Sequence, residues 1–97
     1  MSSETERPLN LDQPLRLQPG YRLQFEPAQN AQVLLFPEGM ITLSDSAGAI
    51  MNACNGERSA NEVVAHLQAQ FPEADLRNDV IEFLTVARQK GWLRDTA

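Results

Sequence analysis

The spacing of apolar residues changes once along this chain, and that change restricts the folds it can adopt. Up to residue 43, apolar residues tend to alternate with polar ones, most strictly in residues 21–26, YRLQFE. A period of two is that of a half-buried β-strand. Beyond residue 44, apolar residues recur at every third or fourth position, which is the spacing of one face of an α-helix. A run of strands followed by a run of helices predicts an α+β domain.

The strand region divides into three segments that are separated by turn residues. Strand-like stretches occupy residues 21–26, 32–36 and 40–43, and the intervening PAQN and PEG contain prolines, an asparagine and a glycine. For FPEG, residues 36–39, we expect a type I turn with a glycine at positive φ, in a three-residue hairpin connection. The sequence therefore predicts a three-stranded antiparallel β-meander.

Three helices are expected after the strands, each with its own start or stop signal. Ser44, Asp45 and Ser46 offer N-cap oxygens to the first helix, which stops before the NG dipeptide at residues 55–56. The second begins with a capping box formed by Ser59 and Glu62, and Pro72 ends it. The third begins near residue 75 and ends at Gly91. Three helices that follow a small sheet resemble a winged helix-turn-helix in outline.

The chain length of 97 residues leaves room for one small domain. We place this domain at residues 20–94, followed by a short C-terminal tail at 95–97. Residues 1–19 hold three prolines and several leucines separated by polar residues, which predicts an extended N-terminal arm with one apolar edge. We expect the arm to lie on its own domain or on a second copy of the chain. In the second case the chain would form a homodimer through the arm.

Charge and hydropathy argue against several classes of partner. The chain has 8 Lys and Arg against 13 Asp and Glu, a net charge of −5, whereas nucleic-acid binding depends on an excess of cations. No apolar run approaches the roughly 20 residues that span a bilayer, and the first residues do not resemble a secretory signal. The single cysteine suits a reducing compartment. We therefore expect a soluble, cytoplasmic protein with no nucleic-acid and no membrane partner.

Residues suited to catalysis or metal binding are scarce. His66 is the only histidine, and it lies beside the apolar stripe of the second predicted helix, where a partly solvated side chain is expected. Cys54 falls on the inward face of the first predicted helix, where a free cysteine acts as a small apolar residue. Neither the spacing of metal ligands nor a phosphate-binding glycine loop is present. The sequence predicts no enzyme, no metal site and no cofactor.

What remains is a surface suited to binding a peptide. A three-stranded meander has two edges, and an exposed edge can be completed by an extended segment of another chain. If residues 40–43 form such an edge, a groove is expected between them and the third helix. That helix carries Ile81 and Val86 in addition to its inward stripe. The alternative is that these two residues widen the core stripe or pack on the N-terminal arm.

Five blocks of the sequence, in the same order and spacing, resemble one known family. They are LLFPEG at residues 34–39, LSDSA at 43–47, IMNACNGERSANEVVAHL at 50–67, DVIEFL at 79–84 and GWL at 91–93. Together they resemble the pyrroloquinoline quinone (PQQ) biosynthesis protein D family, PqqD, over roughly residues 16–93.

The resemblance implies a peptide chaperone without catalytic activity. Members of the family bind the ribosomally made precursor peptide of PQQ and present it to a radical SAM enzyme. It also implies a winged-helix-like fold, in which the peptide adds as a strand beside the third strand and against the third helix. On this basis we assign main-chain contacts to the third strand and side-chain selection to one flank of the third helix. The assigned peptide-binding residues are Met40, Ile41, Thr42, Leu43, Ile81, Thr85 and Arg88.

Two other functions fit the same outline. A DNA-binding winged helix would use outward polar residues of the third helix, but Asp79 and Glu82 oppose phosphate on that helix. A simple dimerisation module would use the leucines of the arm. The residues available to a DNA-recognition helix are Arg77, Asn78, Arg88, Gln89 and Lys90.

Overall fold

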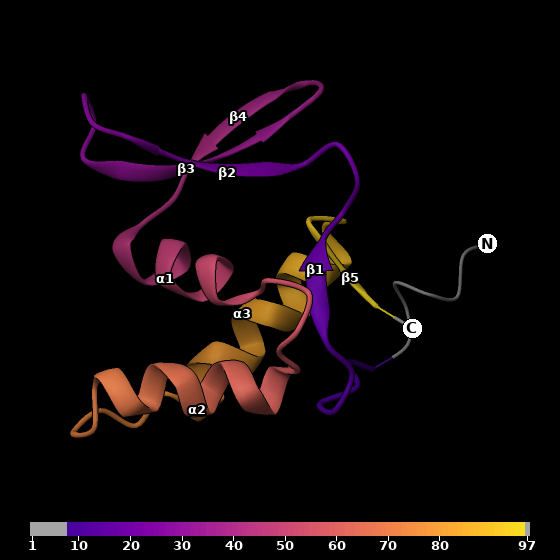
Figure 1. Cartoon of the computed structure of the whole chain (residues 1–97), viewed down its shortest axis with the longest axis vertical. Helices are drawn as coiled ribbons and strands as arrows, with labels where there is room; N and C mark the ends of the chain where they lie inside the picture. The colour runs from indigo at the N-terminus through magenta and orange to yellow at the C-terminus, as the bar shows by residue number, and fades with distance from the viewer. Residues whose placement is uncertain (1–7, 97) are drawn as a thin grey trace.

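The structure, a computed structural model, describes residues 8–96 of the chain. Three strands, β2 (Arg22–Glu26), β3 (Ala31–Phe36) and β4 (Gly39–Thr42), precede three helices, α1 (Asp45–Ala53), α2 (Ala60–Gln70) and α3 (Arg77–Gln89). Two further strands, β1 (Leu15–Leu17) and β5 (Leu93–Asp95), stand before and after this unit in the sequence. Figure 1 shows the three-stranded sheet above the helices.

The sheet is the predicted antiparallel meander in the order β2-β3-β4. Its inner face carries Leu34, which is fully buried, and its cross-strand neighbours Leu23 and Ile41, which pack against the same core. The connection between β3 and β4 is shorter than expected. Phe36 pairs with Gly39, which leaves a loop of two residues rather than three, and Gly39 has the expected positive φ, 155°.

The first two helices begin where the sequence signals place them. The Ser44 hydroxyl accepts a hydrogen bond from the Ala47 amide at 3.2 Å and caps α1. The expected capping box starts α2: the Ser59 hydroxyl accepts from the Glu62 amide at 3.2 Å, and the Glu62 carboxylate accepts from the Ser59 amide at 2.9 Å. No side chain caps α3, so its start was predicted about two residues too early.

A small ribbon of β1 and β5 was not anticipated from the sequence. The strands pair antiparallel, with Leu15 opposite Asp95 and Leu17 opposite Leu93. Leu15 is fully buried in the core, and its amide donates to the Arg58 carbonyl at 2.9 Å. Part of the stretch predicted as an arm, residues 1–19, therefore packs on its own domain, and the predicted tail at 95–97 begins inside a strand. Residues 1–7 and 97 lie outside the described residues.

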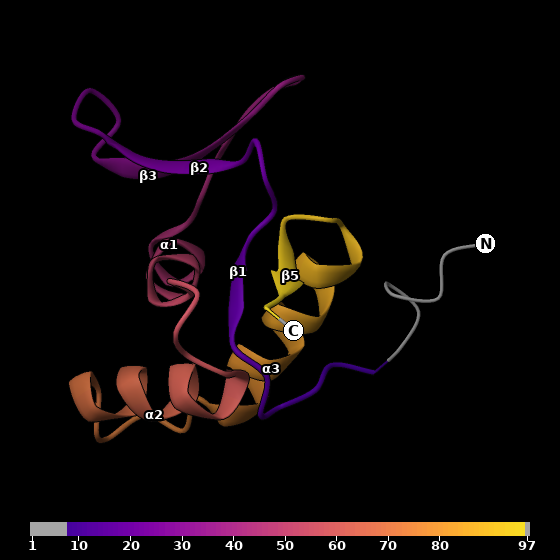
Figure 2. The ribbon, with the colours of Figure 1, turned by 45° about the vertical axis from the view of Figure 1, so that its right-hand side comes forward.

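Helix α1 joins the sheet to the other helices. In both Figure 1 and Figure 2 it lies between the sheet and α2, while α3 runs beside the β1-β5 ribbon. The close packing of α1 on β3 depends on Gly48, because a Cβ there would meet the Gln32 Cβ at 3.1 Å. The fold class is confirmed: an α+β domain with three antiparallel strands followed by three helices. Among residues 8–96, no helix has the length and apolar character needed to span a bilayer.

Candidate functional site

The free edge of β4 presents two residues whose backbone groups point away from the sheet. The Leu43 amide donates to the Gln32 carbonyl at 2.9 Å, so these residues form a hydrogen-bonded pair at the end of the ladder. Hydrogen-bonded pairs alternate with unbonded pairs in an antiparallel ladder, so Ile41 also bonds to β3. The N–H and C=O groups of Met40 and Thr42 therefore face the open edge.

The two edges of the sheet differ in their side chains. The outer edge of β2 begins and ends with charged residues, Arg22 and Glu26, and Pro27 follows it. Charged residues and proline are typical of edges that do not accept another strand. The residues of β4 are uncharged, and Met40 is 57% exposed. Of the two, β4 is the edge suited to strand addition.

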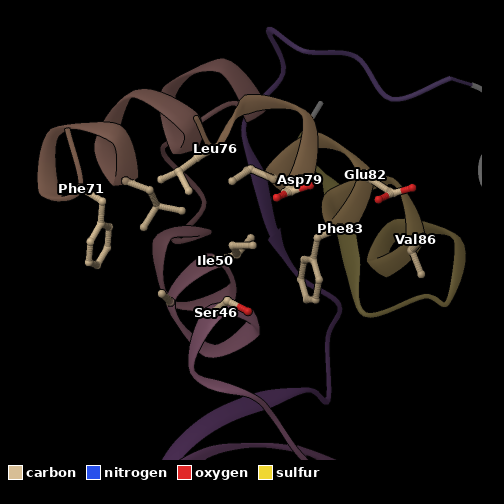
Figure 3. A pocket seen from close by; sticks show the side chains of 11 residues that line it. Ser46, Ile50, Phe71, Leu76, Asp79, Glu82, Phe83 and Val86 are labelled. Carbon is tan, nitrogen blue, oxygen red and sulfur yellow. The ribbon is translucent and has the colours of Figure 1, made fainter. Parts of the chain in front are cut away.

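An apolar groove of about 540 Å³ lies between α1, the end of α2 and α3. Figure 3 shows Phe71 and Phe83 on opposite sides of the groove, with Ile50 between them. Phe71 and Val86 are 53% and 41% exposed, which is high for such large apolar side chains. The lining residues are Ser46, Ala49, Ile50, Leu67, Phe71, Leu76, Asp79, Val80, Glu82, Phe83 and Val86.

The charged groups of the groove are both acidic. The carboxylates of Asp79 and Glu82 lie on its α3 side (Figure 3), and its lining contains no lysine or arginine among the described residues. Asp79 is in the first turn of α3, where the helix dipole favours a negative charge. Glu82 lies beyond that turn, so the dipole does not account for it. The groove therefore combines an apolar floor with a negative wall.

The predicted helix residues lie on the other flank of α3. At 3.6 residues per turn, Arg88 is about 200° around the helix from Val86, which lines the groove. Arg88 is only 5% exposed, and its Nε lies 3.4 Å from Oδ1 of Asp95 in β5. The Thr85 hydroxyl donates to the Ile81 carbonyl at 2.8 Å. The structure thus directs this flank toward the β1-β5 ribbon and does not bring it to the groove.

The predicted strand residues divide between edge and core. Met40 and Thr42 are exposed, Ile41 is half-buried and Leu43 is 6% exposed. None of the four lines the groove between α1 and α3 among the described residues, and the groove expected between this strand and α3 stays a prediction. Val86 was noted in the sequence as surplus to a one-sided helix, but Phe71, Phe83 and the two acids were not assigned to the site.

The structure supplies no group poised for catalysis or metal binding within residues 8–96. No cluster of three His, Cys, Asp or Glu side chains that could hold a metal ion occurs there. Burial raises the pKa of the Cys54 thiol to about 12, and the nearby Arg58 guanidinium offsets only part of that rise. The Cys54 thiol is therefore protonated and unreactive at neutral pH. His66 Nε2 is 3.1 Å from the Gln70 side-chain amide on the surface of α2.

Comparison with known proteins identifies the family. The sequence profile described as "Coenzyme PQQ synthesis protein D (PqqD)" matches residues 31–93. The chain belongs to the PqqD family. An Azotobacter vinelandii member named PqqA binding protein is 52% identical over 79 residues, which cover 80% of this chain and 86% of that protein. An Acinetobacter baumannii protein of the same name is 51% identical over 77 residues, covering 76% and 80%.

A solved PqqD structure has the same fold. The solution NMR structure of the PqqD truncation of Methylobacterium extorquens PqqCD matches with a TM-score of 0.74 and 27% identity, covering 96% of this chain and 99% of that chain. That protein is described as a functional and stand-alone recognition element for ribosomally synthesised and post-translationally modified peptides. The family resemblance found in the sequence is confirmed.

Proposed function

We propose that this PqqD-family chain binds the precursor peptide PqqA in PQQ biosynthesis, as a recognition element without catalytic activity. The peptide adds as a fourth strand to β4. The observation that carries this mode of binding is the outward direction of the Met40 and Thr42 backbone groups on an uncharged edge. The names of the two relatives and the description of the solved PqqD structure support peptide recognition as the role.

A proline scan of β4 tests strand addition because successive amides of this strand point alternately toward the open edge and toward β3. Met40→Pro removes a donor that faces the open edge and leaves the ladder to β3 intact. We expect a folded variant with up to about tenfold weaker affinity for the synthetic precursor peptide, since one hydrogen bond to the peptide is lost. Met40→Ala retains the amide and is the matched control, with affinity close to that of the unmodified chain.

The measurement is an amide NMR titration of labelled protein with the peptide. Shifts in β4 that are present with Met40→Ala and missing with Met40→Pro support the proposal. A folded Met40→Pro variant that binds as tightly as the unmodified chain would show that the peptide does not pair with β4. Ile41→Pro serves as a second control, because its amide faces β3 and the substitution is expected to unfold the sheet.

Delivery of the bound peptide to a radical SAM enzyme in the cytoplasm is part of the same proposal. A strand added to β4 still has one free edge of its own, so the enzyme can reach a peptide that the domain holds. Tethering raises the local concentration of peptide at the enzyme, which offsets the modest affinity of a flexible ligand. Co-elution of all three components, lost with Met40→Pro but not with Met40→Ala, is the expected result.

A homodimer held through the N-terminal arm remains a prediction. Leu9 and Leu11 of this segment pack partly on the core of their own chain, and the Asn61 amide donates to the Leu11 carbonyl at 3.1 Å. Size-exclusion chromatography with light scattering gives the number of chains per particle, and a monomer would contradict the prediction. Deletion of residues 1–7 tests the part of the arm that can be removed without losing these contacts or β1: an unchanged number of chains would show that residues 1–7 take no part in assembly. The DNA-binding alternative is weakened because Arg88, one of its five candidate residues, is buried.

A further inference from the structure

We propose that the groove between α1 and α3 selects one segment of the precursor peptide, in which a bulky apolar side chain neighbours a lysine or arginine. This inference rests on the proposed function, since it concerns the same peptide. It goes further because backbone pairing along β4 is insensitive to sequence, whereas a groove of defined chemistry distinguishes one segment of a peptide from another.

The size and lining of the groove determine the apolar part of the ligand. A volume of about 540 Å³ is within the range of sites that enclose most of a small ligand. Phe71 and Phe83 lie on opposite sides of Ile50 (Figure 3), so an aromatic or branched aliphatic side chain placed in the groove meets an apolar lining on either side. Filling the groove also covers Phe71 and Val86, whose exposure is otherwise unfavourable.

The two carboxylates determine the charge of the neighbouring residue. Asp79 and Glu82 are three positions apart on α3, so their side chains lie on one face of the helix beside the apolar lining. No described cation is recorded in an ion pair with either of them. A lysine or arginine next to the apolar anchor reaches this wall with its charged end while its methylene groups stay against apolar surface.

Residues that line the groove follow closely in sequence after the strand with which the peptide is proposed to pair. Strand β4 ends at Thr42, and Ser46, in the first turn of α1, already lines the groove. The intervening Leu43 is buried and bonded to Gln32, which holds the start of α1 against the sheet. A peptide that follows β4 in the direction of Leu43 therefore runs toward the first turn of α1, where the groove begins, and on this proposal one ligand occupies both surfaces.

The test is a set of binding titrations with the synthetic precursor peptide. The protein variants are Asp79→Asn, Glu82→Gln and their combination, and Glu57→Gln removes one exposed acid that does not line the groove as a matched control. The peptide variants replace each lysine or arginine with norleucine and each bulky apolar residue with alanine, one at a time. Each groove substitution is expected to weaken binding about two- to fivefold, as for partly exposed ion pairs, and Glu57→Gln to leave it unchanged.

The double-mutant comparison identifies the peptide residue. One basic-to-norleucine peptide should bind weakly to the unmodified chain and lose nothing further with the Asp79→Asn and Glu82→Gln combination, because the two changes remove the same contact. An adjacent apolar-to-alanine peptide should weaken binding about tenfold or more. If every peptide substitution changed the affinity by the same factor for the unmodified chain and for the groove variants, the proposed selection would be overturned.

The outcomes separate this inference from the function on which it rests. If the unmodified chain binds the peptide and Met40→Pro weakens binding while the groove variants have no effect, strand addition stands and the groove proposal fails. If the unmodified, folded chain does not bind the peptide, both fail. If weakening by the groove variants disappears in high salt and Met40→Pro also impairs binding, both are supported.

Discussion

Leu15 provides a direct test of whether the segment before residue 20 belongs to the folded domain. Its side chain is fully buried among core residues, although the sequence predicts an extended arm there. Leu15→Ala should destabilise the protein by about 3–5 kcal/mol, the range for a leucine removed from a closed core. For a domain of this size that corresponds to a fall in Tm of roughly 12–40 °C. A loose arm would give almost no change.

Chemical denaturation followed by circular dichroism measures the effect. The m value should stay close to that of the unmodified chain, because the same surface is exposed on unfolding. Arg16→Ala is the matched control in the same strand: Arg16 is exposed and lies directly opposite Arg94, so two like charges face each other. We expect this control to change stability by no more than about 0.5 kcal/mol. A loss below about 1 kcal/mol for Leu15→Ala would refute the assignment of β1 to the core.

Two further outcomes concern helix capping and the buried thiol. Ser59→Ala should cost about 1–2 kcal/mol by denaturation, because it breaks a capping box at a residue only 4% exposed, and Ser44→Ala should cost less at an exposed cap. For Cys54, burial raises the pKa from 9.0 to about 12, so the unfolded chain releases its proton first and stability falls as pH rises through that window. In Cys54→Ala, the part of the loss of stability at alkaline pH that comes from this thiol should be absent. A thiol reagent at neutral pH should modify Cys54 only at the rate of unfolding. Rapid labelling of the folded chain would contradict the burial of the thiol.

Local signals made most of the fold predictable from the sequence. The change of period near Ser44 located the boundary between sheet and helices, and the capping box at Ser59 located the start of α2 to the residue. The two short strands escaped because each has three residues, too few to show a period, and they pair Leu15 with Asp95 from opposite ends of the chain. Pairing between residues so far apart in sequence produces no local pattern that could predict it.

The candidate site was less predictable for a related reason. Helical periodicity identifies the inward stripe of α3, but its two flanks look alike until their neighbours are known. The structure places α1 beside the flank of Val86 and β5 beside the flank of Arg88. The sequence analysis treated Arg88 as an exposed recognition residue, whereas Asp95, which cannot be located by local pattern, draws it into the interior.

Gly48 connects the two surfaces proposed to hold the peptide. A Cβ at this position would lie 3.1 Å from Cβ and Cγ of Gln32 in β3, so either the Gln32 side chain or α1 would have to shift by a few tenths of an ångström. Because α1 forms one wall of the groove and β3 pairs with β4, a shift of α1 would move the groove relative to the edge strand. A peptide of fixed residue spacing can meet both surfaces only if their separation is fixed. If the peptide occupies both surfaces as proposed, the absence of a side chain at residue 48 serves binding register as well as packing.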